Sequence, residues 1–106
     1  VYNFGGRAEV ENITLVRDLC ALLDRLRPRT DRESYAKQIT FVTDRPGHDR
    51  RYAIDDRKAE QALGFTRRYD FRAGLESTVR WYLENQEWCT LVTQPPADAV
   101  ALRRGA

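Results

Sequence analysis

The chain has 106 residues, the length of one small domain, and a domain of this size buries only a limited apolar core. Eighteen lysines and arginines face 16 aspartates and glutamates, so the formal net charge is only +2 and no strong basic field points to nucleic acid. No apolar run approaches the roughly 20 residues that cross a bilayer, so we expect no membrane contact.

The chain opens on a short alternating segment, residues 1–4, whose tyrosine and phenylalanine predict a strand. Gly5 and Gly6 end it, because glycine permits a sharp turn or a close approach of the backbone to a ligand. Since the first residue is valine and the strand begins at once, we expect the sequence to be a piece of a larger protein.

A first helix is predicted over residues 13–26, where apolar residues recur at helical spacing. Asn12 or Thr14 can cap it, since either side chain can accept hydrogen bonds from the free N–H groups of the first turn. Pro28 ends it. Residues 29–37 form a polar linker without a readable pattern, and the β-branched and aromatic residues of 38–43 predict a second strand.

The second strand leads into the loop 44–52, which packs charged residues around a Pro-Gly turn. Proline fixes its own φ and glycine allows a positive φ, so Pro46 and Gly47 predict a tight turn that projects Arg45, His48 and the Arg50-Arg51 pair outward. Arginine and turn N–H groups are good donors to phosphate, so we expect an anionic ligand, most simply a diphosphate. The alternative is an ordinary solvated loop.

Two more helices follow. Asp55 is predicted to cap a helix over 56–63, and Gly64 stands where a left-handed residue ends a helix. Asp70 is predicted to cap a helix that runs to residue 85, with Glu76 and Arg80 paired across one turn. We divide the chain into a subdomain, residues 1–89, and a tail, residues 90–106, that is partly mobile or weakly helical.

The sequence shows few other residues that could form a metal, cofactor or catalytic site. Cys20 and Cys89 lie far apart, and the single histidine leaves no usual zinc site, so we expect no metal. Two free thiols fit a reducing cytoplasm. There is no GxGxxG fingerprint, and no tyrosine is followed by lysine four residues later, so we expect neither a dinucleotide site nor catalytic residues in this chain.

Several strings of residues together form a specific pattern. The loop reads DRPGHDRRYAID from Asp44 to Asp55. Around it stand YNFGG at residues 2–6, NI at 12–13, QITFV at 38–42, LGF at 63–65 and GLESTVRWYL at 74–83. These strings resemble the C-terminal substrate-binding region of dTDP-glucose 4,6-dehydratases, which are extended short-chain dehydrogenase/reductase (SDR) enzymes. They occur in the family's order and spacing over roughly residues 1–88. Phe65, where the family commonly has tryptophan, and the divergent tail are the main departures.

The resemblance implies an α/β fold: a small subdomain of about three helices and two short strands, without the Rossmann domain. It implies that the parent enzyme uses bound NAD to convert dTDP-glucose to dTDP-4-dehydro-6-deoxy-glucose and water, a step toward rhamnose and other deoxysugars. The parent is expected to be a homodimer in the cytoplasm, and this piece alone to be inactive. The positions that the resemblance assigns to the dTDP-sugar are Asn12, Asp44, Arg45, Pro46, Gly47 and His48, with Arg51 and Tyr52 as weaker candidates.

Other functions remain open at this point. Another nucleotide-sugar epimerase or decarboxylase of the same superfamily is the main alternative, and a stand-alone anion-binding module is a second one. His48-Asp49 resembles the HD dyad of metal-dependent phosphohydrolases, but the chain has no further histidine. An RNA-binding module would interleave aromatic residues with the arginines, and none is interleaved here.

Overall fold

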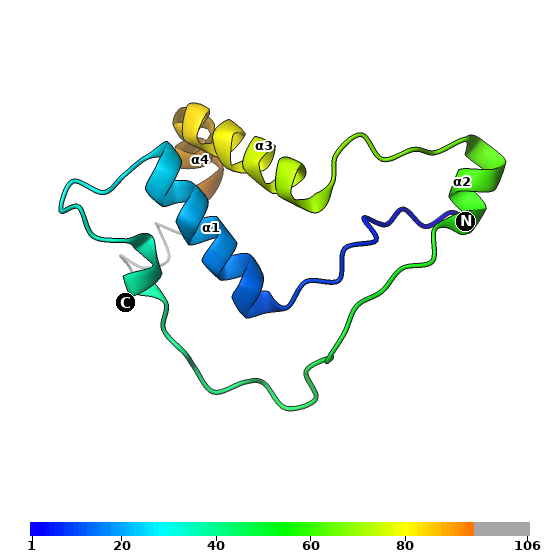
Figure 1. Ribbon diagram of the computed structural model, residues 1–106, viewed down its shortest axis with the longest axis horizontal. Helices are drawn as coiled ribbons and strands as arrows, with labels where there is room; N and C mark the ends of the chain where they lie inside the picture. The colour runs from blue at the N-terminus through cyan, green and yellow to red at the C-terminus, as the bar shows by residue number, and fades with distance from the viewer. Residues whose placement is uncertain (95–106) are drawn as a thin grey trace, which may run out of the picture.

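The structure is a computed structural model that describes residues 1–94. Its elements are, in chain order, α1 (Asn12–Leu26), a short 3₁₀ helix η1 (Tyr35–Gln38), α2 (Arg57–Leu63), α3 (Phe71–Glu84) and α4 (Gln86–Thr93). Figure 1 shows α1 lying along α3 at one end of the molecule and α2 beside the N-terminus at the other, joined by extended segments. The three predicted helices are confirmed, with η1 and α4 in addition.

The α1–α3 pair is joined by packing and by charge. The helices contact each other, and Arg25 on α1 donates to Glu76 on α3 over 2.8 Å. The predicted pairing of Glu76 with Arg80 is also present, at 2.8 Å. The linker after α1 is ordered, because the Asp24 carboxylate accepts hydrogen bonds from the Ser34 hydroxyl, 2.6 Å, and from the Tyr35 N–H, 2.8 Å. These bonds hold η1 against α1.

The helix ends follow the sequence with two corrections. Asp70 caps α3 by accepting from the N–H of Ala73, 2.8 Å, and Gly64 ends α2 at a φ of 63°, as predicted. Asn12 is not a cap, because it is already the first residue of α1 and Glu11 holds the cap position without a side-chain bond. The N-cap of α2 is Asp56, one residue later than predicted.

The two predicted strands are not confirmed. Residues 1–4 and 38–43 contain no strand, and residues 1–94 as described are helical with extended connections. A strand needs a neighbouring strand to pair its backbone N–H and C=O groups, and neither segment has a partner that forms a ladder. Phe41 and Val42 are accordingly 79% and 85% exposed. These β-branched and aromatic side chains favour a strand, but here they have no surface to pack against.

The N-terminal segment is held to α2 by a buried carboxylate. Asp56 is 1% exposed and accepts from the Gly5 N–H, 3.3 Å, from the Arg7 guanidinium, 3.1 Å, and from Arg67. Arg67 also donates to the Gly5 carbonyl, 2.8 Å, and to Glu60, 2.6 Å. A buried carboxylate needs such paired donors, because an unpaired buried charge is costly. This cluster (Arg7, Asp56, Glu60 and Arg67) joins three segments that are distant in sequence.

Little of the apolar surface is buried. Within residues 1–94 only Ala59 and Val79 are buried hydrophobic residues, whereas Trp81, Tyr82 and Trp88 are each more than 40% exposed. The Cα radius of gyration is 18.9 Å, against about 13 Å for a compact domain of this length. A bare apolar surface is thus present within the described residues.

The C-terminal part is only partly described. The helix α4 crosses the predicted boundary at residue 90, so residues 90–93 are helical, and residues 95–106 of the predicted tail lie outside the described residues. The division into subdomain and tail stays a prediction. None of the helices described is long and apolar enough to cross a membrane.

The buried Asp56 carboxylate leads to a stability prediction. We expect Asp56→Asn to lower the free energy of unfolding by about 3 kcal/mol, because it leaves two arginines without their shared buried partner. The matched control is Asp55→Asn, since Asp55 is exposed and pairs only with the nearby Arg57. Urea unfolding curves measure both. A change in Asp56→Asn no larger than that in Asp55→Asn would contradict a stabilising role for the buried cluster.

Candidate functional site

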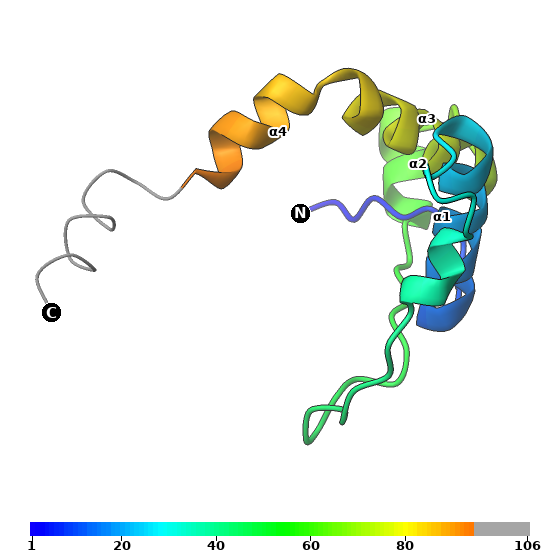
Figure 2. The ribbon, with the colours of Figure 1, turned by 90° about the vertical axis from the view of Figure 1, so that its left-hand side faces the viewer.

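An open groove of about 730 Å³ separates the N-terminal segment from the loop 44–52. One wall is formed by residues 8–12 together with Leu15 of α1, and the other by residues 48–52. Figure 2 shows the loop extending away from the helices, so that it stands clear of the α1–α3 pair. The groove therefore joins two of the segments on which the sequence predicted ligand contacts, the start of α1 and the charged loop.

The two walls are joined by one ion pair. Arg51 donates to the Glu9 carboxylate through two nitrogens, over 2.5 and 2.7 Å, although 42 residues separate them in sequence. This two-pronged contact with Arg51 lowers the pKa of Glu9, and the same contact raises the pKa of Arg51. Both groups therefore carry their charges at neutral pH, and the pair is neutral as a whole.

The turn of the loop is organised by Asp44. Its carboxylate contacts the Nδ1 atom of His48 over 2.6 Å and accepts from the backbone N–H of Arg45 over 2.8 Å. Contact with His48, and secondarily the bond from the Arg45 N–H, lowers the pKa of Asp44. Gly47 has a φ of 70°, which only glycine adopts without strain, so the predicted Pro-Gly turn is present. The contact fixes one imidazole nitrogen and leaves the other for a ligand.

Tyr52 is held within the loop. Its hydroxyl donates to the Asp49 carboxylate over 2.5 Å, and this bond, with a smaller contribution from burial, raises the pKa of Tyr52. The phenol therefore stays protonated at neutral pH and its proton is already engaged. A ligand could then use only the oxygen or the ring of Tyr52.

The structure brings together half of the predicted site residues. Asn12, His48, Arg51 and Tyr52 line the groove, so Asn12 and His48 lie on the same side of the molecule. The lining does not include the first part of the loop, which comprises Asp44, Arg45, Pro46 and Gly47. Among the described residues the Asn12 side chain makes no hydrogen bond, so its amide is available to a ligand.

Sequence reasoning missed Glu9, and it named Arg50 among the charges that the turn projects outward but not among the candidate ligand contacts. Arg50 lines the groove and, within residues 1–94, forms no ion pair. Glu9 could not be found from the sequence, because its partner is 42 residues away and only the fold brings them together. The roles of all these residues toward a ligand stay predictions.

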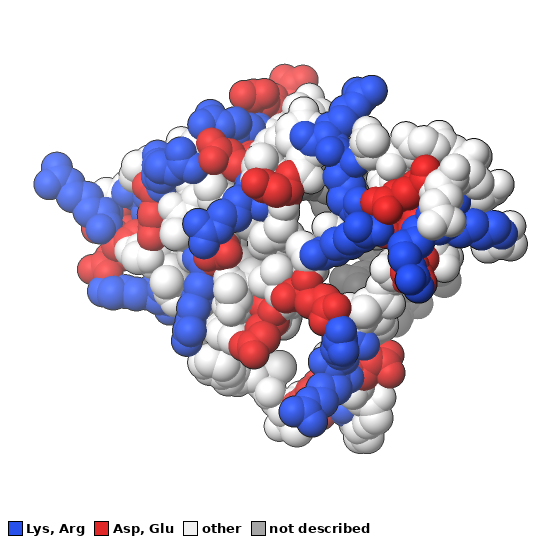
Figure 3. Space-filling view, turned by 45° about the vertical axis from the view of Figure 1, so that its right-hand side comes forward, with Lys and Arg blue, Asp and Glu red and all other residues white. Residues whose placement is uncertain are grey.

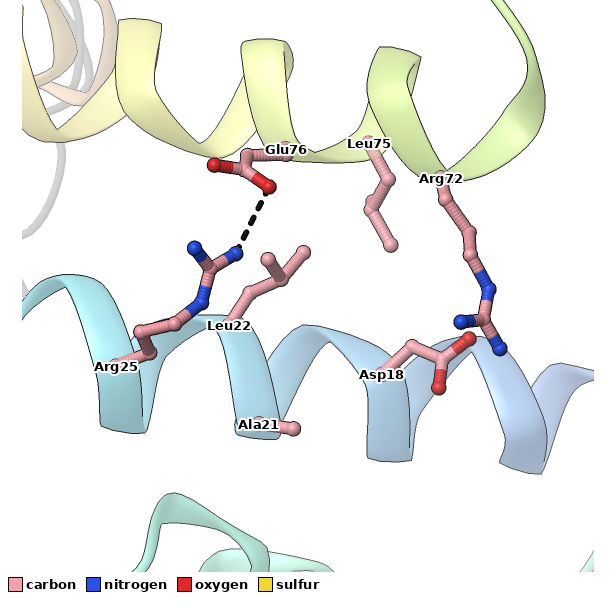
Figure 4. Close-up of a pocket in the computed structure, with 7 residues that line it drawn as sticks. All are labelled: Asp18, Ala21, Leu22, Arg25, Arg72, Leu75 and Glu76. Atoms are coloured by element: carbon pink, nitrogen blue, oxygen red, sulfur yellow. Dashed lines mark hydrogen bonds and ion pairs between the residues drawn. The ribbon is translucent and has the colours of Figure 1, made fainter.

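A second cavity, of about 310 Å³, lies between α1 and α3 (Figure 4). Asp18, Leu22 and Arg25 face Arg72, Leu75 and Glu76 there, and the Arg25–Glu76 ion pair crosses one end of it. None of the predicted site residues lines this cavity. In Figure 3 basic and acidic side chains alternate over the visible face, so this face carries no continuous basic stripe of the kind that tracks a nucleic-acid backbone.

Comparisons with known proteins show what the chain is similar to. A sequence model of the family described as "GDP-mannose 4,6 dehydratase" matches residues 1–78. A dTDP-glucose 4,6-dehydratase of Xanthomonas campestris is 54% identical over 87 residues, which are 82% of this chain and 25% of that protein. A probable dTDP-glucose 4,6-dehydratase of Sinorhizobium fredii is 52% identical over 99 residues, 93% of this chain and 27% of that protein.

A solved structure shares the fold. The crystal structure of the dTDP-glucose 4,6-dehydratase of Bacillus anthracis, in complex with NAD, superposes on this chain with a TM-score of 0.64 at 40% identity. The superposition covers 83% of this chain and 25% of that one. This chain thus spans about a quarter of the length of the relatives that it matches.

The family model matches about three quarters of the chain, so the chain belongs to the GDP-mannose 4,6 dehydratase family. Within that family, the relatives described above carry the particular name dTDP-glucose 4,6-dehydratase, so the resemblance seen in the sequence is confirmed.

The Asp44–His48 contact yields a prediction about pH. Because the pKa of Asp44 is lowered in the folded protein, the contact stabilises the turn above the ordinary pKa of aspartate and is lost as the pH falls through the lowered value. In His48→Ala we expect the pKa of Asp44 to rise toward its ordinary value. Carboxyl chemical shifts followed by NMR through an acid titration measure this. An Asp44 pKa that is the same in both proteins would show that His48 does not hold the turn.

Proposed function

We propose that this chain is the substrate-binding part of a dTDP-glucose 4,6-dehydratase, a lyase that forms dTDP-4-dehydro-6-deoxy-glucose and water. The observation that carries the proposal is the groove, which brings Asn12 together with His48 of the charged loop. These residues belong to the strings that resemble the family, and the named relatives share 47–54% identity over more than four fifths of the chain. Binding, rather than proton transfer, is the role we assign to the groove.

The donors of the groove suit an anionic, hydroxyl-rich ligand. Asn12 offers an amide without a partner among the described residues, His48 offers its second ring nitrogen, and Arg50 offers a guanidinium. Amides and imidazoles hydrogen-bond hydroxyls and phosphate oxygens, and guanidinium binds phosphate with two parallel bonds. Such contacts would hold the diphosphate and sugar in register for chemistry performed elsewhere in the protein, which is a positioning contribution.

The remaining proposed contacts do not line the groove, so they are proposed on different grounds from Asn12 and His48. They are Asp44, Arg45, Pro46 and Gly47. They lie at the turn beyond the groove, so they would reach the ligand only where it extends along the loop. Gly47 has no neighbouring heavy atom within 4 Å of where a Cβ would stand, so the turn is open to approach. Arg45 then provides a charge for the nucleotide end, and Asp44 orients His48.

NAD is proposed for the whole protein and not for this chain. The sequence has no glycine-rich fingerprint, the pattern by which a dinucleotide's pyrophosphate is held at the start of a helix. We therefore derive no step through NAD from these residues. A homodimeric state and a cytoplasmic location likewise stay predictions for the whole protein.

Substrate turnover by the full-length protein tests the proposal. We expect dTDP-glucose to be converted to the 4-dehydro-6-deoxy product, followed by mass spectrometry, and GDP-mannose, the substrate named in the family description, to be converted far more slowly. The isolated 106-residue chain should convert neither nucleotide sugar and should bind no NAD. It has neither the GxGxxG fingerprint nor a tyrosine followed by lysine four residues later. Conversion of GDP-mannose in preference to dTDP-glucose would assign the other substrate, and turnover by the isolated chain would refute the binding role.

Substitutions of two loop residues, Arg45 and His48, are predicted to raise KM to different extents. In the full-length protein Arg45→Ala should raise KM for dTDP-glucose by roughly tenfold to a hundredfold, the value of one lost charge-assisted bond to phosphate. His48→Ala should act in the same direction with a smaller effect where the imidazole is neutral. Melting temperatures should stay nearly unchanged, because both side chains are exposed.

Arg57→Ala is the matched control for Arg45→Ala, because Arg57 is an exposed arginine whose partner, Asp55, lies two residues away and outside the groove. Its KM should equal that of the wild type. If both loop variants keep the wild-type KM while their melting temperatures fall, the loop is structural and the binding site lies elsewhere.

A further inference from the structure

We propose that Glu9 is a positioning residue that sets the width of the groove by clamping Arg51, and that Arg51 acts through this clamp rather than by touching the ligand. The inference rests on the proposed function. It deepens that function by separating the residues that shape the groove from those that contact the nucleotide sugar.

The first step is the geometry of the contact. Glu9 and Arg51 meet through two nitrogen–oxygen contacts, 2.5 and 2.7 Å, and the pair spans the groove from one wall to the other. A two-pronged contact between guanidinium and carboxylate restricts orientation as well as distance. Among the hydrogen bonds and ion pairs of the described residues, no other joins residues 8–12 to residues 48–52. The clamp is therefore the polar link that relates one wall to the other.

The second step is the place of each partner. Glu9 lies three residues before Asn12, and Arg51 lies three residues after His48. Fixing Glu9 to Arg51 thus fixes the separation between the Asn12 amide and the His48 ring, the two groups proposed to contact one ligand. Loss of the clamp leaves both groups in place on their own segments but leaves their separation undefined.

The third step distinguishes Arg51 from Arg50. Glu9 already occupies two nitrogens of the Arg51 guanidinium, and drawing Arg51 to a phosphate would leave Glu9 as an unpaired negative charge beside an anionic ligand. Arg50 lines the same groove without an ion pair in the described part of the chain. We therefore assign the two neighbouring arginines different roles. Arg51 positions the wall of the groove, and Arg50 is available to contact the ligand.

The fourth step concerns stability. The side chains of Arg51 and Glu9 are 67% and 49% exposed, and an exposed pair contributes little to folding. This contrasts with Asp56, whose carboxylate is buried. Breaking the clamp should therefore change ligand binding while leaving global unfolding nearly unchanged.

The experiment compares variants of the full-length protein, with dTDP-glucose as the probe. Glu9→Gln and Arg51→Gln each remove the clamp, and both should raise KM by about fivefold with kcat unchanged. The exchanged pair, Glu9→Arg with Arg51→Glu, should return KM to within about twofold of the wild type, because opposite charges again face each other across the groove. Melting curves show whether each variant is folded.

Glu76→Gln is the matched control, since Glu76 forms an exposed ion pair with Arg25 over 51 residues of sequence but lines a different cavity. Its KM should stay at the wild-type value. A rise in KM for Arg51→Gln much larger than that for Glu9→Gln, without rescue by the exchanged pair, would show that Arg51 binds the ligand directly. Tighter binding in Glu9→Gln would show that Glu9 competes with the ligand, and it would equally overturn the proposal.

The Arg45→Ala and His48→Ala variants separate this inference from the proposed function. If they raise KM while Glu9→Gln does not, the loop binds the nucleotide sugar and the clamp alone is refuted. If none of these variants changes KM, the proposed site itself fails.

Discussion

The arrangement of this chain depends on one buried carboxylate. Asp56 begins α2 and accepts from the backbone N–H of Gly5 and from the guanidinium groups of Arg7 and Arg67, so one side chain anchors the N-terminal segment, α2 and the connection to α3. The charge is tolerated in its buried position because several donors surround it. A Cβ atom at Gly5 would stand 3.2 Å from the Cβ of Ile54, a tight contact, so the glycine suits this position. The close approach at Gly5 is thus made to the side chain of Ile54 in the same chain.

The groove follows from that anchor. The segment between Gly5 and Asn12 is held at one end by Asp56 and continues at the other end into α1, and between them Glu9 reaches Arg51 of the loop. The two ion clusters differ in kind. The Asp56 carboxylate is buried among partly exposed partners, whereas the Glu9–Arg51 pair is exposed and is proposed to position the walls of the groove. Many large apolar side chains are also exposed, and the chain spans about a quarter of its relatives' length.

Local signals were enough for several features. The helical spacing in α1 and α3, the Asp70 cap, the left-handed Gly64 and the Pro-Gly turn each depend on neighbours within about four residues, so the sequence predicts them without knowledge of the fold. The two strand predictions were wrong for the opposite reason. Side chains such as Phe41 and Val42 favour a strand, but a strand forms only where a second one lies beside it. Similarly, nothing near Asp56 in sequence shows that it, and not Asp55, would be the buried cap.

The family and the candidate ligand contacts could be predicted from the residues alone, because the loop from Asp44 to Tyr52 and the strings around it form a specific pattern in one linear order. The three predicted helices could be located in the same way. The folded chain was needed to show that Asn12 and His48 share a groove, that Arg51 is engaged by Glu9 while Arg50 is not, and that Asp56 is buried. The physical reason is that these contacts join residues about 36 to 51 positions apart, and such contacts depend on the path of the whole chain rather than on any local preference.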